Sequence, residues 1–406
     1  WSGRANGWIY DRMFGVYGKA VKEADPKVQV IAGWGMKCHE DHWAAWDILY
    51  QPTIDQHIDY IDGIHEHHYM GDTTDIAGSY ETVVAYTMTE HDKWVYCHNT
   101  ETSDLLDIPA VGVNTTPEKA AANRQYRVGT YNLRDIIYLC AQVPDKAMAR
   151  TVIHNDRDKP ATEMCYGSLA NLRGRLVTSQ STDSKVWVAA SIDGTDPLAT
   201  RPAGGQALVA AIWNDHRETV EVAISLEAPT GTTFTDGELR LPWFDHETRA
   251  LNLDSQATSA SGDQWSQTID IPGRAVVVVE LPLQGQVPEQ AERQRQQFFA
   301  KGIRRAVTPG AQQELSIELS DEDRQGCRQV WLRLALEHVA VGEGIVEVNG
   351  QRFELPPAIC RDNGNLMASI ELPIELLQTT NTIVFGLADG NHQGYQVDAT
   401  SIVIER

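Results

Sequence analysis

Polar and aromatic side chains follow several short apolar runs in the first part of the sequence. When such runs form parallel strands, their carboxyl ends meet at one edge of the sheet, so the residues that follow them share one site. Histidine, asparagine and tyrosine offer hydrogen bonds to hydroxyl groups, and tryptophan offers a broad apolar face to the C–H side of a sugar. Eight residues are candidates for such a site: Trp34, His65, His67, Tyr69, His98, Asn99, Glu101 and His154.

Glu101 is the carboxylate in this group that best fits nucleophilic chemistry. A retaining glycoside hydrolase uses two carboxyl groups about 5 to 5.5 Å apart, one as nucleophile and one as acid and base. A carboxylate at a strand end among His, Asn and Tyr donors stays ionised and aimed, as a nucleophile must. We therefore predict that Glu101 is the nucleophile and that the other seven residues bind substrate. The alternative for Glu101 is a solvated loop glutamate.

The elements that must position these residues lie within residues 1–165. Helical and strand patterns alternate there, as in proteins built on a parallel sheet. Apolar residues recur at helical spacing over residues 8–24, where Asp25-Pro26 ends the pattern. Further helices are expected at 43–50, 80–90 and 116–141, and strands at 28–32, 58–64, 93–97 and 149–153.

The pattern changes after residue 165 to short strands separated by Gly, Pro, Asp and Thr clusters. Such a pattern is typical of antiparallel β-sandwiches. We expect a first sandwich over residues 166–285, a linker or bridging helix over 286–313 and a second sandwich over 314–406. Asn349-Gly350 predicts a hairpin in the second sandwich. The tryptophans here are expected in the cores, except Trp243 in a loop.

The motifs of the first part resemble those of clan A glycoside hydrolases. His67-His68-Tyr69 is similar to the His-x-Tyr that ends barrel strand 6 in that clan, and Thr100-Glu101 matches the nucleophile at the end of strand 7. Ala24-Asp25-Pro26 and the strand after it look like the end of helix 4 and strand 5. A barrel followed by two sandwiches most resembles the β-agarase/β-porphyranase family.

The resemblance implies an α/β plus all-β fold, in which the second half of a (β/α)8 TIM barrel precedes two antiparallel β-sandwich domains. It implies a retaining hydrolase of β-linked galactan, agarose-type or porphyran, which needs no cofactor and no metal. Tyr69 would then hold Glu101. In the clan, the acid/base Glu follows an Asn on barrel strand 4, and no such pair precedes the first helix here. We therefore expect the acid/base and strands 1 to 4 upstream of Trp1, and no activity from this chain alone.

Several alternatives remain open. Glu66 becomes the nucleophile if the strand assignment slips by one element. His65, Glu66, His67, His68 and His98 could bind zinc, although they lack the i, i+4 helical spacing of a zincin. The chain could also belong to an arabinofuranosidase- or xylosidase-like exo-enzyme. A non-catalytic fragment that binds carbohydrate through its aromatic residues is a further alternative.

The net charge of −22 at a pI near 4.9 argues against nucleic acid and anionic membranes as partners, because a phosphate binder needs a basic face. No apolar run is long enough to span a bilayer. We expect a polysaccharide or oligosaccharide as the partner. The family resemblance implies a secreted or periplasmic enzyme.

Overall fold

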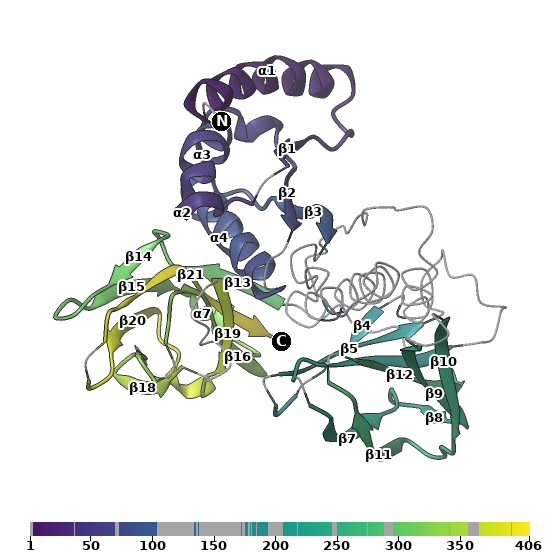
Figure 1. The fold of residues 1–406 in the computed structure, drawn as a ribbon. Helices are drawn as coiled ribbons and strands as arrows, with labels where there is room; N and C mark the ends of the chain where they lie inside the picture. Colours follow the sequence, from purple (N-terminus) through teal and green to yellow (C-terminus); the bar gives the residue numbers. More distant parts are fainter. Residues whose placement is uncertain are drawn as a thin grey trace, which may run out of the picture. The chain divides into compact units, whose positions relative to one another are not determined.

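The computed structural model describes residues 3–103, 175–193, 206–245, 250–287, 295–355 and 365–406, together with Arg134, Ile137 and Leu172. Residues 36, 70–72, 178, 180, 184, 217, 274, 341 and 391 are excepted from these ranges. The chain forms two compact units (Figure 1). Of the described residues, the first unit contains 3–102 and 295–406, and the second contains 175–287 together with 103, 134, 137 and 172.

A three-stranded sheet with the order β1-β2-β3 lies in the first unit. Its strands are β1 (Ile31–Gly33), β2 (Gly63–Tyr69) and β3 (Tyr96–Ser103). β1 and β2 run parallel, and helix α4 (Thr73–His91) connects β2 to β3. The remaining helical elements are α1 (Gly3–Ala24), α2 (Glu40–Ala45), the π-helical turn η1 (Trp46–Tyr50), α3 (Gln51–His57) and the 3-10 turn η2 (Ile58–Tyr60).

The three strands begin at residues 31, 63 and 96, later than the expected 28, 58 and 93. Side-chain bonds hold the backbone just before them. The Asp62 carboxylate accepts a hydrogen bond from the Val30 amide at 2.7 Å and pairs with Lys22 Nζ at 2.6 Å. Lys93 donates to the Ile58 carbonyl at 2.7 Å. The ladder therefore starts only after these polar contacts.

The two faces of this sheet have different surroundings. In parallel strands, side chains alternate between faces and paired residues share a face. Ala32, Ile64, Glu66, Val95 and Cys97 share one face, and each is at most 4% exposed. The other face, called here the open face, carries the half-buried residues His65, His67 and His98 and leaves Ile31 and Tyr96 38% and 44% exposed. Parallel sheets are normally covered on both faces, so the open face is unusual.

Helix α1 packs against η1 and α3 through its least bulky side. A Cβ atom on Gly7 would lie 2.3 Å from the Ile48 carbonyl oxygen, and one on Gly15 would lie 2.4 Å from the His57 ring. Asp11 on the same side pairs with His57 at 3.1 Å. Five apolar residues of the helix face away from this contact and are exposed, and we call them the α1 stripe: Ile9, Met13, Val16, Tyr17 and Val21. None of the helices in the described part of the chain has the length and hydropathy that a bilayer span requires.

The second unit contains two antiparallel sheets. The larger follows the order β10-β9-β12-β6-β5-β4, with β8 paired to β12, and the smaller pairs β11 with β7. Trp187, Trp213 and Trp265 are buried, as expected. The loop predicted for Trp243 is wrong, because this residue pairs with Asn252 within strand β9; its side chain lies outside the described part. The strands are β4 (Arg175–Val177), β5 (Val186–Asp193), β6 (Ala207–Asn214), β7 (Val220–Glu227), β8 (Thr232–Phe234), β9 (Gly237–Asp245), β10 (Ala250–Thr258), β11 (Gln264–Ile271) and β12 (Val276–Gly285).

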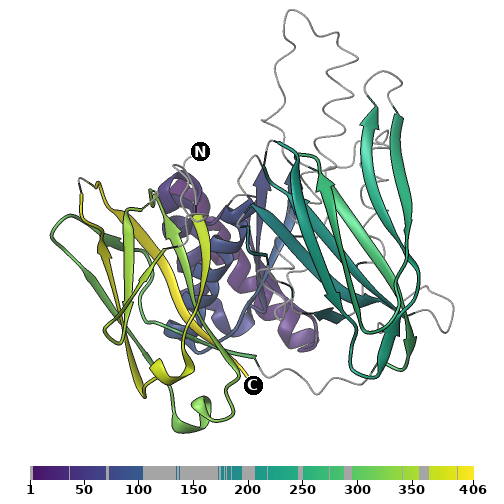
Figure 2. The same cartoon turned by 90° about the horizontal axis from the view of Figure 1, so that it is seen from below.

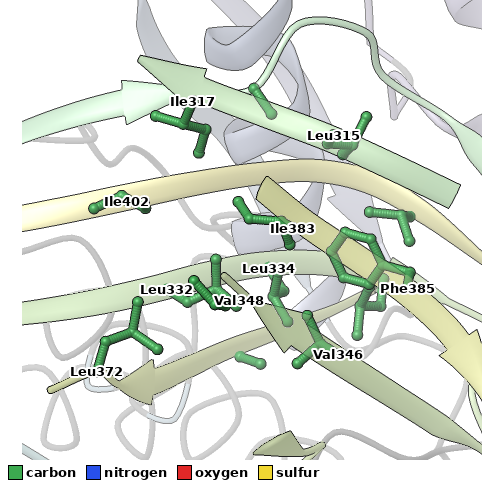
Figure 3. Close-up of a cluster of buried hydrophobic side chains, with 14 of the residues drawn as sticks. Leu315, Ile317, Leu332, Leu334, Val346, Val348, Leu372, Ile383, Phe385 and Ile402 are labelled. Carbon is green, nitrogen blue, oxygen red and sulfur yellow. The ribbon is translucent and has the colours of Figure 1, made fainter. Parts of the chain in front are cut away.

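A second sandwich completes the first unit. Its five-stranded sheet has the order β13-β21-β16-β19 with β14 beside β21, and its four-stranded sheet has the order β15-β20-β17-β18. Leucine, isoleucine, valine and phenylalanine side chains from both sheets meet between them (Figure 3). The elements are β13 (Arg295–Phe299), β14 (Arg305–Val307), β15 (Gln313–Glu318), α7 (Asp321–Arg324), β16 (Gln329–Glu337), β17 (Gly344–Val348), β18 (Gln351–Glu354), β19 (Asn365–Glu371), η4 (Ile374–Leu376), β20 (Thr380–Leu387) and β21 (Tyr395–Glu405).

Two expectations for this region have different outcomes. The hairpin at Asn349-Gly350 is confirmed: it joins β17 to β18, and both residues have positive φ (49° and 82°), as a type I′ turn requires. The linker or bridging helix expected over residues 286–313 is wrong where the structure describes it. Residues 295–299 and 305–307 pair with β21 as strands instead, and Gln297 of the first strand donates to the Glu81 carboxylate of α4.

Helix α4 lies against the five-stranded sheet (Figure 2). Glu81 of α4 is only 7% exposed. Its carboxylate pairs with Arg333 of β16 at 3.3 Å and accepts hydrogen bonds from Ser401 of β21 at 3.1 Å and from Gln297 of β13. Nearby, the Trp43 indole donates to Glu337 at 2.9 Å. The sandwich therefore packs on the helical layer of the three-stranded sheet through buried, charge-assisted contacts.

Arg333→Leu tests this contact. The substitution leaves the Glu81 carboxylate buried without its cation, so the free energy of unfolding should fall by about 3 kcal/mol. Lys301→Ala is the control, because Lys301 makes an exposed 3.9 Å pair with Glu90, and its loss should change stability by no more than about 0.5 kcal/mol. Urea denaturation measures both, and equal effects of the two substitutions would contradict the prediction.

Candidate functional site

Trp34 stands at the carboxyl end of β1 and is 41% exposed. The Tyr50 hydroxyl accepts a hydrogen bond from the Trp34 amide at 3.3 Å and lies 3.1 Å from the Trp34 carbonyl oxygen, to which it can donate. The Tyr10 ring meets the indole edge to face at 5.7 Å between centroids. The indole is thus held in place while part of its surface faces solvent, as a stacking platform for a sugar requires.

His65 and His67 lie side by side on the open face of β2, with ring centroids 5.9 Å apart. Two glycines let the chain after β1 approach them. A Cβ atom on Gly33, whose φ is +149°, would lie 2.0 Å from the His65 carbonyl oxygen. A Cβ atom on Gly35 would lie 3.1 Å from His67 Nδ1. Glycine at residue 33 is therefore required for this approach.

His98 joins this group from β3. A Cβ atom on Gly63, at the start of β2, would lie 3.0 Å from His98 Nε2. Burial lowers the pKa of His98. Burial also lowers the pKa of His65, and the neighbouring charge of His67 lowers it further. At neutral pH both imidazoles are therefore mainly neutral, and each can donate one hydrogen bond and accept another.

Glu66 lies between these histidines in sequence but on the opposite face of β2. It is fully buried. Its Oε2 atom accepts hydrogen bonds from the Cys38 amide at 2.5 Å and from the Ser79 hydroxyl at 3.2 Å. A carboxylate in this place cannot reach an anomeric carbon in a cleft on the open face. The structure thus gives no support to Glu66 as the nucleophile.

The structure places His65, His67 and His98 on the open face of the sheet, within β2 and β3 and not in the segments after them, and it places Trp34 directly after β1. Tyr69 ends β2, and Asn99 and Glu101 belong to β3, so Glu101 lies within a strand and not in the segment after it. The side chains of these three residues, and the whole of His154, lie outside the described part. Tyr10 and Tyr50 support the site but were not foreseen, because their helical positions gave no signal of it.

Within the described ranges, no group of three or more His, Cys, Asp or Glu residues could hold a metal ion. The arrangement instead offers the neutral imidazoles of His65 and His98 and a fixed indole directly after β1. Such a surface suits a neutral, hydroxyl-rich ligand, since each hydroxyl can pair with an imidazole nitrogen and the C–H face of a sugar ring can lie on the indole.

Comparison with solved structures shows a clear likeness of fold. The protein BuGH86, solved in complex with neoagarooctaose, matches 98% of this chain at a TM-score of 0.72 and 13% identity, and a variant of the same protein gives 0.73. The chain spans 66% of the length of that protein. A β-porphyranase of glycoside hydrolase family 86 from the human gut bacterium Bacteroides plebeius matches 100% of this chain and 74% of its own, at a TM-score of 0.68 and 14% identity. No family model matches the sequence, and no curated protein does so.

The pKa directions predict the titration of the site. His65 should titrate below 6.5, and the His67→Gln variant should raise its pKa, because the repulsion between two imidazolium groups is lost. Because the pKa of His65 is lower in the folded state than in the unfolded state, protonation favours unfolding. The contribution of His65 to the free energy of unfolding is therefore complete above pH 6.5 and is lost as the pH falls below that value. Histidine NMR titration measures the His65 pKa in the parent protein and in His67→Gln, and the signal missing from His65→Gln assigns it. A His65 pKa above 6.5 would contradict the prediction.

Proposed function

We propose that this chain is the C-terminal part of a retaining glycoside hydrolase that cleaves a β-linked galactan such as agarose or porphyran. The likeness of fold to family 86 structures over nearly the whole chain supports this proposal. One of those proteins was solved with neoagarooctaose, and another is a β-porphyranase. We also propose that the enzyme is secreted or periplasmic, where a polymeric substrate is accessible.

The observation that carries the proposal is the set of imidazoles, His65, His67 and His98, on the open face of β2 and β3, with Trp34 directly after β1. In barrel enzymes, the carboxyl ends of the strands carry the chemistry. Glu101 lies in β3, three residues after His98, and we assign it as the nucleophile, with Tyr69 as its hydrogen-bond partner. The imidazoles, Asn99 and His154 would bind sugar hydroxyls, and the Trp34 indole would stack on a ring.

The second carboxyl group of the mechanism must come from elsewhere on the barrel. It has to lie about 5 to 5.5 Å from the nucleophile, and Glu66 is buried on the opposite face. The open face of the sheet and the α1 stripe are both surfaces that a closed barrel would cover. We therefore assign the acid/base to further β/α units that pack on these surfaces and complete the barrel.

Glu101→Gln in the complete enzyme tests the nucleophile. Turnover of agarose and porphyran should fall by about a thousandfold or more, because the amide cannot form the covalent intermediate. The binding of neoagarooctaose should stay within about threefold, since the shape of the side chain is kept. Glu23→Gln, on the exposed surface of α1, is the matched control. Retained turnover, or faster cleavage of arabinoxylan than of either galactan, would contradict the proposal.

Val16→Lys tests the completed barrel. Val16 is 67% exposed in this chain, so the lysine should change its stability by no more than about 0.5 kcal/mol. In the complete enzyme the same lysine would be buried against apolar side chains, and stability should fall by about 3 kcal/mol. Lys19→Ala, on the same helix, should have little effect in either protein. The proposal fails if Val16→Lys is harmless in both, or if the encoding DNA upstream supplies no β/α units.

A further inference from the structure

The buried Glu66 carboxylate has a structural cost that its surroundings must offset. It is completely shielded from solvent, and an ionised group in that position costs several kcal/mol unless it is hydrogen-bonded. The bonds from the Cys38 amide and the Ser79 hydroxyl provide this compensation. Through these two bonds, the carboxylate connects β2 to the segment that ends at Cys38 and to helix α4.

The Cys38 amide belongs to the rim segment, residues 33–38, which carries Trp34 and ends just before α2. Tyr10 and Tyr50 hold its beginning: the Gly33 amide donates to the Tyr10 hydroxyl at 2.7 Å, and Tyr50 binds the Trp34 backbone. Glu66 holds its end at 2.5 Å. The described residues of the rim segment are therefore fixed on both sides of the exposed indole.

Glu66 is also the residue between His65 and His67 on β2. Any displacement of the Cys38 amide from Glu66 shifts the rim segment relative to both imidazoles. Gly35 already lies in contact with the His67 ring, so there is little room for another arrangement. The Tyr50 hydroxyl, 3.2 Å from the His65 carbonyl oxygen, ties the same two pieces of chain together.

We propose that Glu66 is a positioning residue of the sugar-binding surface: its bond to the Cys38 amide sets the rim segment, and with it the Trp34 indole, against His65 and His67. A hydrogen bond in a buried, low-dielectric place is electrostatically stronger than one in water, which suits a segment that contains two glycines and carries an exposed indole. The sugar-binding part of this inference rests on the proposed function, whereas the positioning of the rim segment does not.

Hydrogen exchange measured by mass spectrometry tests the positioning directly. In Glu66→Ala, a peptide covering residues 31–39 should exchange about tenfold faster or more, because the Cys38 amide loses a charged acceptor. Peptides from β16 and β21 should be unchanged. Glu66→Gln should retain most of the protection, since its amide oxygen still accepts from Cys38, and Ser79→Ala leaves that bond in place. Unchanged exchange of residues 31–39 in Glu66→Ala, or equal acceleration in all peptides, would overturn the proposal.

Binding of neoagarooctaose, measured by calorimetry in the complete enzyme, tests the consequence for the site. Glu66→Ala should weaken binding by about tenfold when Trp34 is present and by much less in a Trp34→Ala background, because the effect passes through the indole. An equal loss in both backgrounds would overturn the proposal. If the parent enzyme binds neither neoagarooctaose nor porphyran oligosaccharides, the proposed function fails, and the exchange experiment still decides the role of Glu66.

Discussion

The parallel register of β1 on β2, with Gly33 opposite His65, is the constraint on which the candidate site depends. A slip of one residue would exchange the two faces of β2. His65 and His67 would then be buried under the helices, and Glu66 would point to the open face. Two features oppose such a slip. Only glycine fits opposite the His65 carbonyl oxygen at residue 33, and the Glu66 carboxylate is bound to the Cys38 amide.

Helix α4 links this register to the C-terminal sandwich. Residues two apart on a helix point in nearly opposite directions, and Ser79 and Glu81 use this geometry. Ser79 donates to Glu66 beneath β2, while Glu81 meets Arg333, Gln297 and Ser401 of the sandwich. The sandwich in the first unit is thus part of the framework that supports the strand ends. It is not an appended module that could be removed without effect.

The sequence was sufficient for the order of the elements, because periodicity and turn chemistry are local signals. The helix–strand alternation, the Asn349-Gly350 hairpin and the place of Trp34 directly after β1 follow from such signals, whereas His65, His67 and His98 lie within β2 and β3 and not after them. Whether Glu101 carries out the chemistry stays a prediction.

What the sequence could not provide depends on contacts between distant residues. The polar run that contains Gln297 predicted a linker or bridging helix, yet it forms β13, where α4 supplies a buried partner for Gln297. The spacing of Ile9, Met13 and Val16 predicted a helix but not which side of it is buried, and the glycine side makes that contact. The strand starts were misplaced because the role of Asp62 depends on Val30 and Lys22.

The bond between Glu81 and Ser401 joins residues 320 positions apart, which has a consequence for biosynthesis. At about 5 to 20 residues per second, a ribosome needs roughly 15 to 60 seconds to proceed from α4 to β21. During that time the Glu81 carboxylate on the outer side of α4 lacks its hydrogen-bond partners, and the apolar surface around it is uncovered. This side of α4 therefore cannot reach its folded contacts until β21 has left the exit tunnel.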